Sequence, residues 1–210
     1  MKKQFYLLSF LLSVFAFYSC KTANKLYNKG DYDGAVELAV KKLNKKPNDA
    51  EVQSLLQDAY RYAVNEKENA ISGLSQSNNE LKWDTIYNEY AALQKLYTAI
   101  NRSPEARAVV NAADYSSYLG TYAEKAADVR LERGVRLMDN NDRNSFKNAF
   151  YEFQAAHKFR PTNDIKNKMD EAYDAAVIRV VILPSDQIGY GNNYGYNAGY
   201  RHVNYQMQNF

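Results

Sequence analysis

The stretch "GDYDGAVELAVKKLNKKPNDAEV" (Gly30–Val52) contains a turn, an amphipathic segment and a proline that would end a helix. Its apolar residues recur at the spacing that places side chains on one face of a helix, namely Ala35, Val36, Ala39 and Leu43. Pro47 follows, and proline cannot continue a helix and also pushes its N-terminal neighbour out of helical geometry. The stretch therefore predicts a helix over 32–46 with one apolar face.

The same pattern recurs twice further along the chain. Three prolines lie 57 residues apart, and an alanine precedes each of them at a constant distance: Ala35 and Pro47, Ala92 and Pro104, Ala149 and Pro161. Four positions after each alanine the chain has an apolar residue, namely Ala39, Leu96 and Phe153. Fixed-period similarity of this kind predicts a helical array in which neighbouring units share a core.

The repeated pattern resembles the tetratricopeptide repeat, in its second helix and in the junction that follows. The residues that carry the resemblance are Gly30, Tyr32, Ala35 and Pro47 in the first unit, Ala92, Leu96, Ala99 and Pro104 in the second, and Ala149, Phe153, Ala156 and Pro161 in the third. The resemblance implies stacked antiparallel helix pairs with a surface that binds peptides or assembles complexes. The period here is longer than that of the family, so an unrelated bundle of helical hairpins is the alternative.

The expected fold is all-α, a TPR-like array of antiparallel helical hairpins over residues 20–176. The expected helices lie near 22–29, 32–46, 49–71, 81–101, 144–159 and 163–177, with another from Pro104 to about Asp139 that is either continuous or broken near Tyr115–Gly120. The polar stretches Ser72–Glu80 and Asp139–Ser145 predict loops. Two late helices show apolar stripes, one with Phe146, Phe150, Phe153 and His157 and the other with Ile165, Met169, Ala172 and Ala176.

The pattern changes at Val177. "VIRVVILP" (Val177–Pro184) is rich in β-branched residues and predicts a strand, and "HVNYQM" (His202–Met207) is a candidate partner strand. Residues 177–210 are therefore expected to form a short C-terminal β-strand or hairpin. The alternative is that they begin a further α/β domain.

The N-terminus has the features of a signal peptide. Lys2 and Lys3 precede an apolar run over Phe5–Tyr18, which is too short for a stable membrane-spanning helix. The only cysteine, Cys20, follows this run, and the pattern resembles a bacterial lipoprotein signal. The resemblance implies removal of residues 1–19 and a lipid on Cys20. A plain secretory signal with a free cysteine and a retained membrane anchor are the alternatives.

Charge and composition narrow the class of partner. The formal net charge of the chain is +3, and cleavage would remove Lys2 and Lys3 from its 27 basic residues. The near balance with 24 acidic residues argues against nucleic acid, which usually requires a basic footprint. Lys21 follows the cysteine with no acidic residue nearby, which favours the periplasmic face of the outer membrane as the location.

The sequence contains no convincing motif for a catalytic, cofactor or metal site. "GYGNNY" has Tyr194 where a dinucleotide fingerprint needs its third glycine, and "DNNDRNSFKNAF" has Phe150 where a calcium loop needs glutamate. His157 lies on an apolar stripe and is expected to pack or to end a helix, and His202 lies far from any other ligand type. Trp83 is expected to anchor the core of a hairpin, with a ligand-stacking platform as the alternative.

The leading functional hypothesis is a lipid-anchored scaffold of the cell envelope that binds another protein through its helical surface and is not an enzyme. The first alternative is an accessory N-terminal module of a larger envelope enzyme or transport lipoprotein. The second is a glycan-binding lipoprotein that uses Trp83 and tyrosines.

Overall fold

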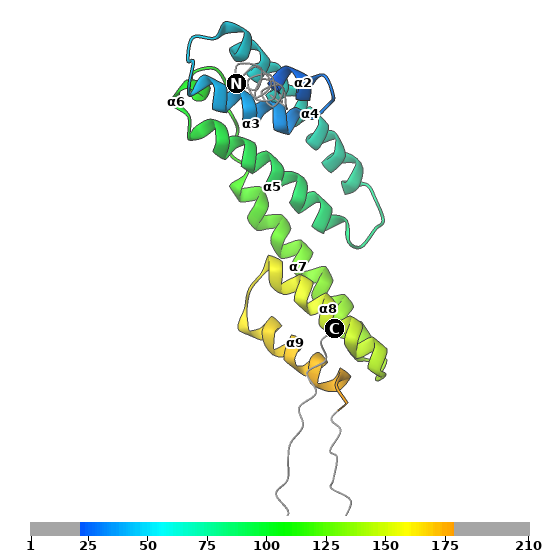
Figure 1. The fold of residues 1–210 in the computed structure, drawn as a ribbon. Coiled ribbons are helices and arrows are strands. Elements are labelled where there is room, and N and C mark those ends of the chain that lie inside the picture. The colour runs from blue at the N-terminus through cyan, green and yellow to red at the C-terminus, as the bar shows by residue number, and fades with distance from the viewer. Residues whose placement is uncertain (1–21, 179–210) are drawn as a thin grey trace, which may run out of the picture. The chain divides into compact units, whose positions relative to one another are not determined.

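The computed structural model describes residues 22–178, and the regular secondary structure in that range is entirely helical (Figure 1). The helices are α2 (Ala23–Tyr27), α3 (Tyr32–Leu43), α4 (Ala50–Ser75), α5 (Lys82–Asn101), α6 (Pro104–Arg107), α7 (Ser116–Met138), α8 (Arg143–Phe159) and α9 (Asn163–Ala176). The predicted all-α class is confirmed for this range. None of the helices in it has the length and apolar content that a bilayer crossing requires.

Short polar side chains fix the helix starts. The N-cap residues whose side chains accept a hydrogen bond from a backbone N–H of the first turn are Thr22, Asp31, Asp49, Ser103, Asp142 and Thr162. Each satisfies a donor that the helix itself leaves unpaired. Gly30, in the turn before α3, has a φ of 81°, a conformation that glycine adopts at little cost. The glycine-containing turn that the sequence predicts is therefore present.

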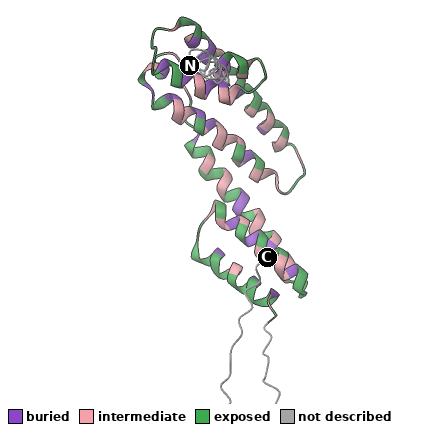
Figure 2. Cartoon of the chain, viewed as in Figure 1, coloured by how far each residue is buried: buried purple, intermediate pink, exposed green. Residues whose placement is uncertain are grey.

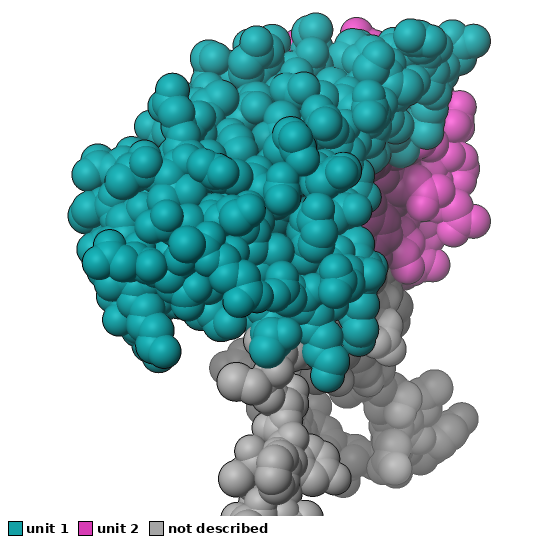
Figure 3. Space-filling model, turned by 90° about the horizontal axis from the view of Figure 1, so that it is seen from above, with its two compact units in different colours: residues 1–126 teal, residues 127–210 magenta. Residues whose placement is uncertain are grey.

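The chain divides into two compact units, Met1–Ala126 and Ala127–Phe210, with the boundary inside α7. Figure 3 colours the two units separately. The range 20–176, which the sequence presents as one helical domain, thus contributes to both units.

The main core of the first unit lies where α2, α3 and α6 pack with α4 and α5. Buried residues concentrate there (Figure 2), and most of them are small or branched, including Ala35, Ala39, Leu43, Leu56, Ala59 and Ile100. A smaller cluster joins α4 and α5 to the start of α7 through Ile71, Ile86, Leu93 and Tyr115. Consecutive helices pack against one another from α2 to α6.

Helix α4 is longer than the sequence predicts. The prediction of a loop over Ser72–Glu80 is wrong at its start, because the helix continues to Ser75. In the added turn Leu74 packs with Ile71 against the cluster that contains Ile86. This burial outweighs the low helix propensity of the serines and glycine in the same turn.

Of the two alternatives for Pro104 to Asp139, the broken helix is present, but its break lies a few residues before the predicted position. Pro104 opens the short helix α6, an irregular segment over 108–115 follows, and α7 begins at Ser116. The break therefore comes before Gly120, which lies inside α7. Val110 of the irregular segment is buried in the main core of the first unit.

The second unit is built from the end of α7, α8 and α9. Its core contains Ala149, Phe153 and Ala172, with Leu131 and Met169 packed against them. The predicted stripe on α9 is confirmed, since Ile165, Ala172 and Ala176 are buried and Met169 is half-buried.

The predicted stripe on α8 is confirmed only in part, since Phe153 is buried and Phe150 packs against the core but Phe146 and His157 are not core residues. The residues of α8 that are buried are Ser145, Ala149, Glu152, Phe153 and Ala156, whereas Phe146, Phe150 and His157 are half-buried. The carboxylate of Glu152 accepts hydrogen bonds from Arg130 at 2.7 Å and Arg133 at 3.0 Å. This charge pairing allows a glutamate on the buried face, which hydropathy alone would exclude.

The predicted C-terminal strand falls mostly outside the described residues. Val177 and Ile178 are the part of it that the structure describes, and they are neither helix nor strand.

Two glycines of α7 give a matched test of the packing in the second unit. A Cβ atom on Gly134 would collide with the buried ring of Phe153, whereas a Cβ atom on Gly120 meets nothing within 4 Å. Gly120→Ala should raise the free energy of unfolding by about 0.5–1 kcal/mol through helix propensity. Gly134→Ala should lower it by about 1 kcal/mol or more through overpacking. Urea unfolding followed by circular dichroism measures both, and equal stabilisation by the two variants would contradict this packing.

Candidate functional site

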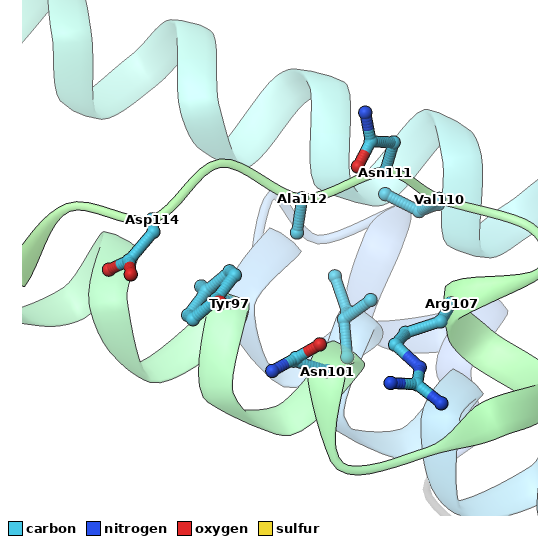
Figure 4. Close-up of a pocket in the computed structure, with 8 residues that line it drawn as sticks. Tyr97, Asn101, Arg107, Val110, Asn111, Ala112 and Asp114 are labelled. Atoms are coloured by element: carbon cyan, nitrogen blue, oxygen red, sulfur yellow. The ribbon is translucent and has the colours of Figure 1, made fainter.

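A pocket of about 320 Å³ lies in the first unit, between the end of α5, the short helix α6 and the segment that follows it. Its volume is at the lower end of the range of ligand pockets, about 300–1,000 Å³. Its lining residues are Tyr97, Ile100, Asn101, Arg107, Val110, Asn111, Ala112 and Asp114. Figure 4 shows Arg107 and Asp114 at opposite ends, with Tyr97, Asn101 and Ala112 between them.

The irregular segment over 108–115 is held in place by three side chains of neighbouring helices. Gln57 of α4 donates to the carbonyl oxygen of Val109 at 3.3 Å, and the hydroxyl of Tyr60 accepts from the N–H of Ala113 at 3.0 Å. Gln94 of α5 accepts from the N–H of Tyr115 at 2.6 Å. The backbone above the pocket is thus fixed at several points, so the pocket is formed before any ligand arrives.

The two charged residues of the pocket differ in their partners. The backbone N–H of Ser116, with the side chains of Gln94 and Ser116, holds the pKa of Asp114 below its usual value. Its carboxylate is therefore ionised and already hydrogen-bonded. Arg107 is exposed and makes no ion pair with another described residue.

The other polar residues of the pocket are also available to a ligand. The side chains of Tyr97, Asn101 and Asn111 form no hydrogen bond with the described part of the chain. In Figure 4 the methyl group of Ala112 points toward the α5 side chains, whereas the amide of Asn111 points away from them. Amide, phenol and guanidinium groups with an apolar floor suit the recognition of polypeptide groups, and a single cation suits one carboxylate.

A row of aromatic rings connects α5 to the start of α7. Trp83 stacks on Tyr122 at 5.9 Å between ring centroids, Tyr122 on Tyr90 at 5.1 Å, and Tyr90 on Tyr118 at 4.8 Å. We call these four residues the aromatic row. Tyr118, at its far end, is 47% exposed.

Trp83 contacts charged, aromatic and apolar neighbours. The ammonium groups of Lys82 and Lys125 lie 4.8 Å and 4.6 Å from the centre of its ring. Lys82 also donates to the carbonyl oxygens of Ser75 and Ser77, at the end of α4. Trp83 packs against the second core cluster of this unit. These contacts favour the core-anchor interpretation of Trp83 over a ligand-stacking platform.

Among the sequence-predicted repeat residues, Ala35 and Ala149 are fully buried and Ala92 is half-buried. Pro47 lies in a turn after α3, Pro161 lies in the connection between α8 and α9, and Pro104 opens α6 after α5. Cys20 and His202 lie outside the described residues, and His157 is half-buried on α8.

The pocket residues were not singled out by the sequence. Arg107 is one exposed arginine among many charged residues, and neither motif nor period distinguishes it. The available signal was the short helix signature of Ser103 followed by Pro104, which marks a break between longer helices.

Comparison of the chain with protein-family models, with curated proteins and with solved structures finds no match. Within residues 22–178, no cluster of three or more His, Cys, Asp or Glu side chains is arranged to hold a metal ion.

Half-buried Tyr90 and buried Tyr115 make the stability of this unit depend on pH. Burial, with the neighbouring phenols of Tyr122 and Tyr118, raises the pKa of Tyr90 to about 12. Burial, with Tyr60 and a hydrogen bond to Glu68, raises the pKa of Tyr115 to about 12.

We expect two tyrosines of the folded protein to ionise late in an alkaline titration. Because the folded pKa lies above the unfolded value of about 10, their contribution to stability is present below pH 10 and is lost as the pH rises from 10 to 12. Phenolate absorbance during titration measures this, with urea-unfolded protein as the control. Tyr90→Phe should remove one late group, and an unchanged titration curve would contradict the burial of Tyr90.

Proposed function

We propose that this chain is a lipid-anchored scaffold of the cell envelope that binds another protein through the first helical unit. The observation that carries the proposal is the preformed pocket beside α5 and α6, whose cation and amides have no partner among the described residues. Such a pocket binds a ligand without first breaking internal hydrogen bonds. Its groups are those that recognise polypeptide side chains and amides.

The arrangement of the helices supports a TPR-like scaffold. Helices α3, α4 and α5 pack consecutively, and α8 packs on α9. The two long helices α4 and α5 run side by side as a hairpin joined by a short loop (Figure 1). Stacked hairpins of this kind expose extended surfaces on which partner proteins bind.

The membrane anchor in the proposal is a lipid on Cys20. The support comes from the sequence, in which Lys2, Lys3 and an apolar run precede the only cysteine. Acylation there would hold the protein at the membrane, since each buried CH₂ group contributes about 0.8 kcal/mol. Lys21 supports the periplasmic face of the outer membrane as the location.

The glycan-binding alternative has less support. It requires a free aromatic face, and Trp83 stacks on Tyr122 while two ammonium groups approach its ring. The alternative of an accessory module for a larger envelope enzyme concerns residues 177–210, of which the structure describes Val177 and Ile178.

The anchor is tested by Cys20→Ser in a bacterial host. The variant should appear in the soluble fraction, because it lacks the thiol that receives the lipid, whereas the wild-type protein should stay with membranes. Fractionation after a carbonate wash measures this. A variant that remains in the washed membranes would contradict a lipid on Cys20.

The scaffold is tested by photo-crosslinking in intact cells. A photoreactive residue at Asn111, on the rim of the pocket, should crosslink to one partner protein in stoichiometric yield. The same residue at Lys166, an exposed position of α9, serves as the control. Mass spectrometry of the product identifies the partner. Equal, diffuse crosslinking from both positions would contradict a binding site at the pocket.

A further inference from the structure

A basic segment lies at the end of α3. The sequence "VKKLNKKPN" places Lys41, Lys42, Lys45 and Lys46 around the C-terminus of this helix, and all four are exposed. None of them forms an ion pair with another described residue. The helix dipole favours cations at a C-terminus and accounts for Lys41 and Lys42 in the last turn. It does not account for Lys45 and Lys46, which lie beyond the helix.

The fold brings this segment next to the pocket. Asn44, between the two pairs of lysines, accepts a hydrogen bond of 2.5 Å from the hydroxyl of Ser103, the N-cap of α6. Leu43 shares a buried cluster with Ile100 and Ala106. The end of α3, the end of α5 and α6 therefore meet at one edge of the first unit.

Two arginines on the same edge add to its charge. Arg102 follows α5 and Arg107 ends α6; both are exposed and neither pairs with a described carboxylate. We call these two arginines and the four lysines the basic edge. The carboxylates near the basic edge and the pocket are Asp49, which caps α4, Glu105, which lies 3.3 Å from the Ser103 hydroxyl, and Asp114, which lies at the other end of the pocket from Arg107 (Figure 4) and already accepts hydrogen bonds from Ser116 and Gln94. Positive charge therefore dominates this part of the surface.

We propose that the basic edge and the pocket together bind an acidic segment of a partner protein, with one carboxylate of that segment held by Arg107. This inference rests on the proposed scaffold function and names the chemistry of the partner. The lysines supply long-range attraction, which raises the association rate and falls with salt. Arg107 supplies the directional contact, since a guanidinium can hold a carboxylate through two parallel hydrogen bonds.

The pocket favours a polypeptide over a membrane surface as the source of the negative charge. Its floor includes Ile100 and Val110, which are buried, and the ring of Tyr97 lies beside Asn101. An acidic side chain with its apolar stem and adjoining amide fits this mixture of groups. Lipid headgroups would contact the exposed lysines alone and would make no use of the cavity.

Binding of a synthetic acidic peptide to the purified full chain tests the proposal. The probe is a fluorescein-labelled peptide of alternating Glu and Ala residues, and the matched probe has Gln in place of every Glu. Fluorescence anisotropy should show binding of the Glu peptide and weakening by salt. The Gln peptide should not bind.

Three variants distinguish peptide binding in the pocket from long-range electrostatic attraction to the basic edge. Arg107→Gln should weaken binding of the Glu peptide about tenfold or more, through the lost charge-assisted hydrogen bonds. Ala112→Leu changes no charge but fills the pocket, and it should weaken binding to a similar degree. Lys166→Gln, with the same charge change on exposed α9, should leave affinity unchanged. Circular dichroism checks the fold of each variant, and Asn101→Leu replaces Ala112→Leu if that variant does not fold.

Several outcomes would overturn the inference. Unchanged affinity in Arg107→Gln and Ala112→Leu would mean that the charge is attractive but the pocket is not used. Binding to phosphatidylglycerol vesicles that the Glu peptide cannot displace would assign the basic edge to a membrane surface. A partner crosslinked from Asn111 while the Glu peptide fails to bind would retain the scaffold and overturn only the acidic partner. Binding of the Glu peptide without any partner crosslinked from Asn111 in cells would overturn the proposed scaffold function, and with it the acidic partner.

Discussion

The close approach of helices at small residues is the constraint on which both units depend. The fully buried alanines lie on nearly every helix of the described range, and include Ala35, Ala39, Ala59, Ala63, Ala149, Ala156 and Ala172. Packed helix axes lie about 8–10 Å apart, and small side chains at the crossing allow the shorter separations. The constraint is strictest at Gly134, where even alanine is too large, because the ring of Phe153 occupies the space where a Cβ atom would lie. Large side chains such as Leu43 and Ile100 then fill the gaps between the crossings.

Tyrosine has a second structural role in the first unit. Of the 19 tyrosines in the chain, those of the aromatic row stack on one another between α5 and the start of α7. Tyr60 accepts a hydrogen bond at its hydroxyl from the backbone N–H of Ala113, and the ring of Tyr115 packs beside that of Tyr90. The tyrosine ring can pack at one end and form a hydrogen bond at the other. Tyrosine therefore suits helix contacts that are only partly shielded from water. These contacts also fix the segment above the pocket, which links the unusual composition to the candidate site.

Much of the local structure is predictable from particular residues. The stripe of α3 and the stripe of α9 are confirmed, and Asp31, Asp49 and Thr162 start helices where the sequence places them. The errors fall where packing competes with local preference. Leu74 extends α4 through a stretch of serine and glycine, and Val110 of the segment after α6 is buried in the core. On α8 the ion pairs of Glu152 accompany a charged side chain on the buried face, next to Phe153. A hydropathy pattern cannot contain such pairs, because both partners are polar and far apart in sequence.

The sequence by itself determined the helical class, the turns at Gly30 and near the three prolines, and the starts of most helices, because periodicity, capping and proline act within a few residues. The proposed lipid site at Cys20 also comes from sequence alone. Only the tertiary structure decided that Arg107, Tyr97 and Ala112 line one pocket and that the lysine-rich end of α3 contacts the start of α6. The physical reason is that these neighbours are joined by contacts between distant segments, such as Asn44 with Ser103 and Gln57 with Val109. Such contacts depend on how the helices pack, and no local pattern in the chain encodes their partners.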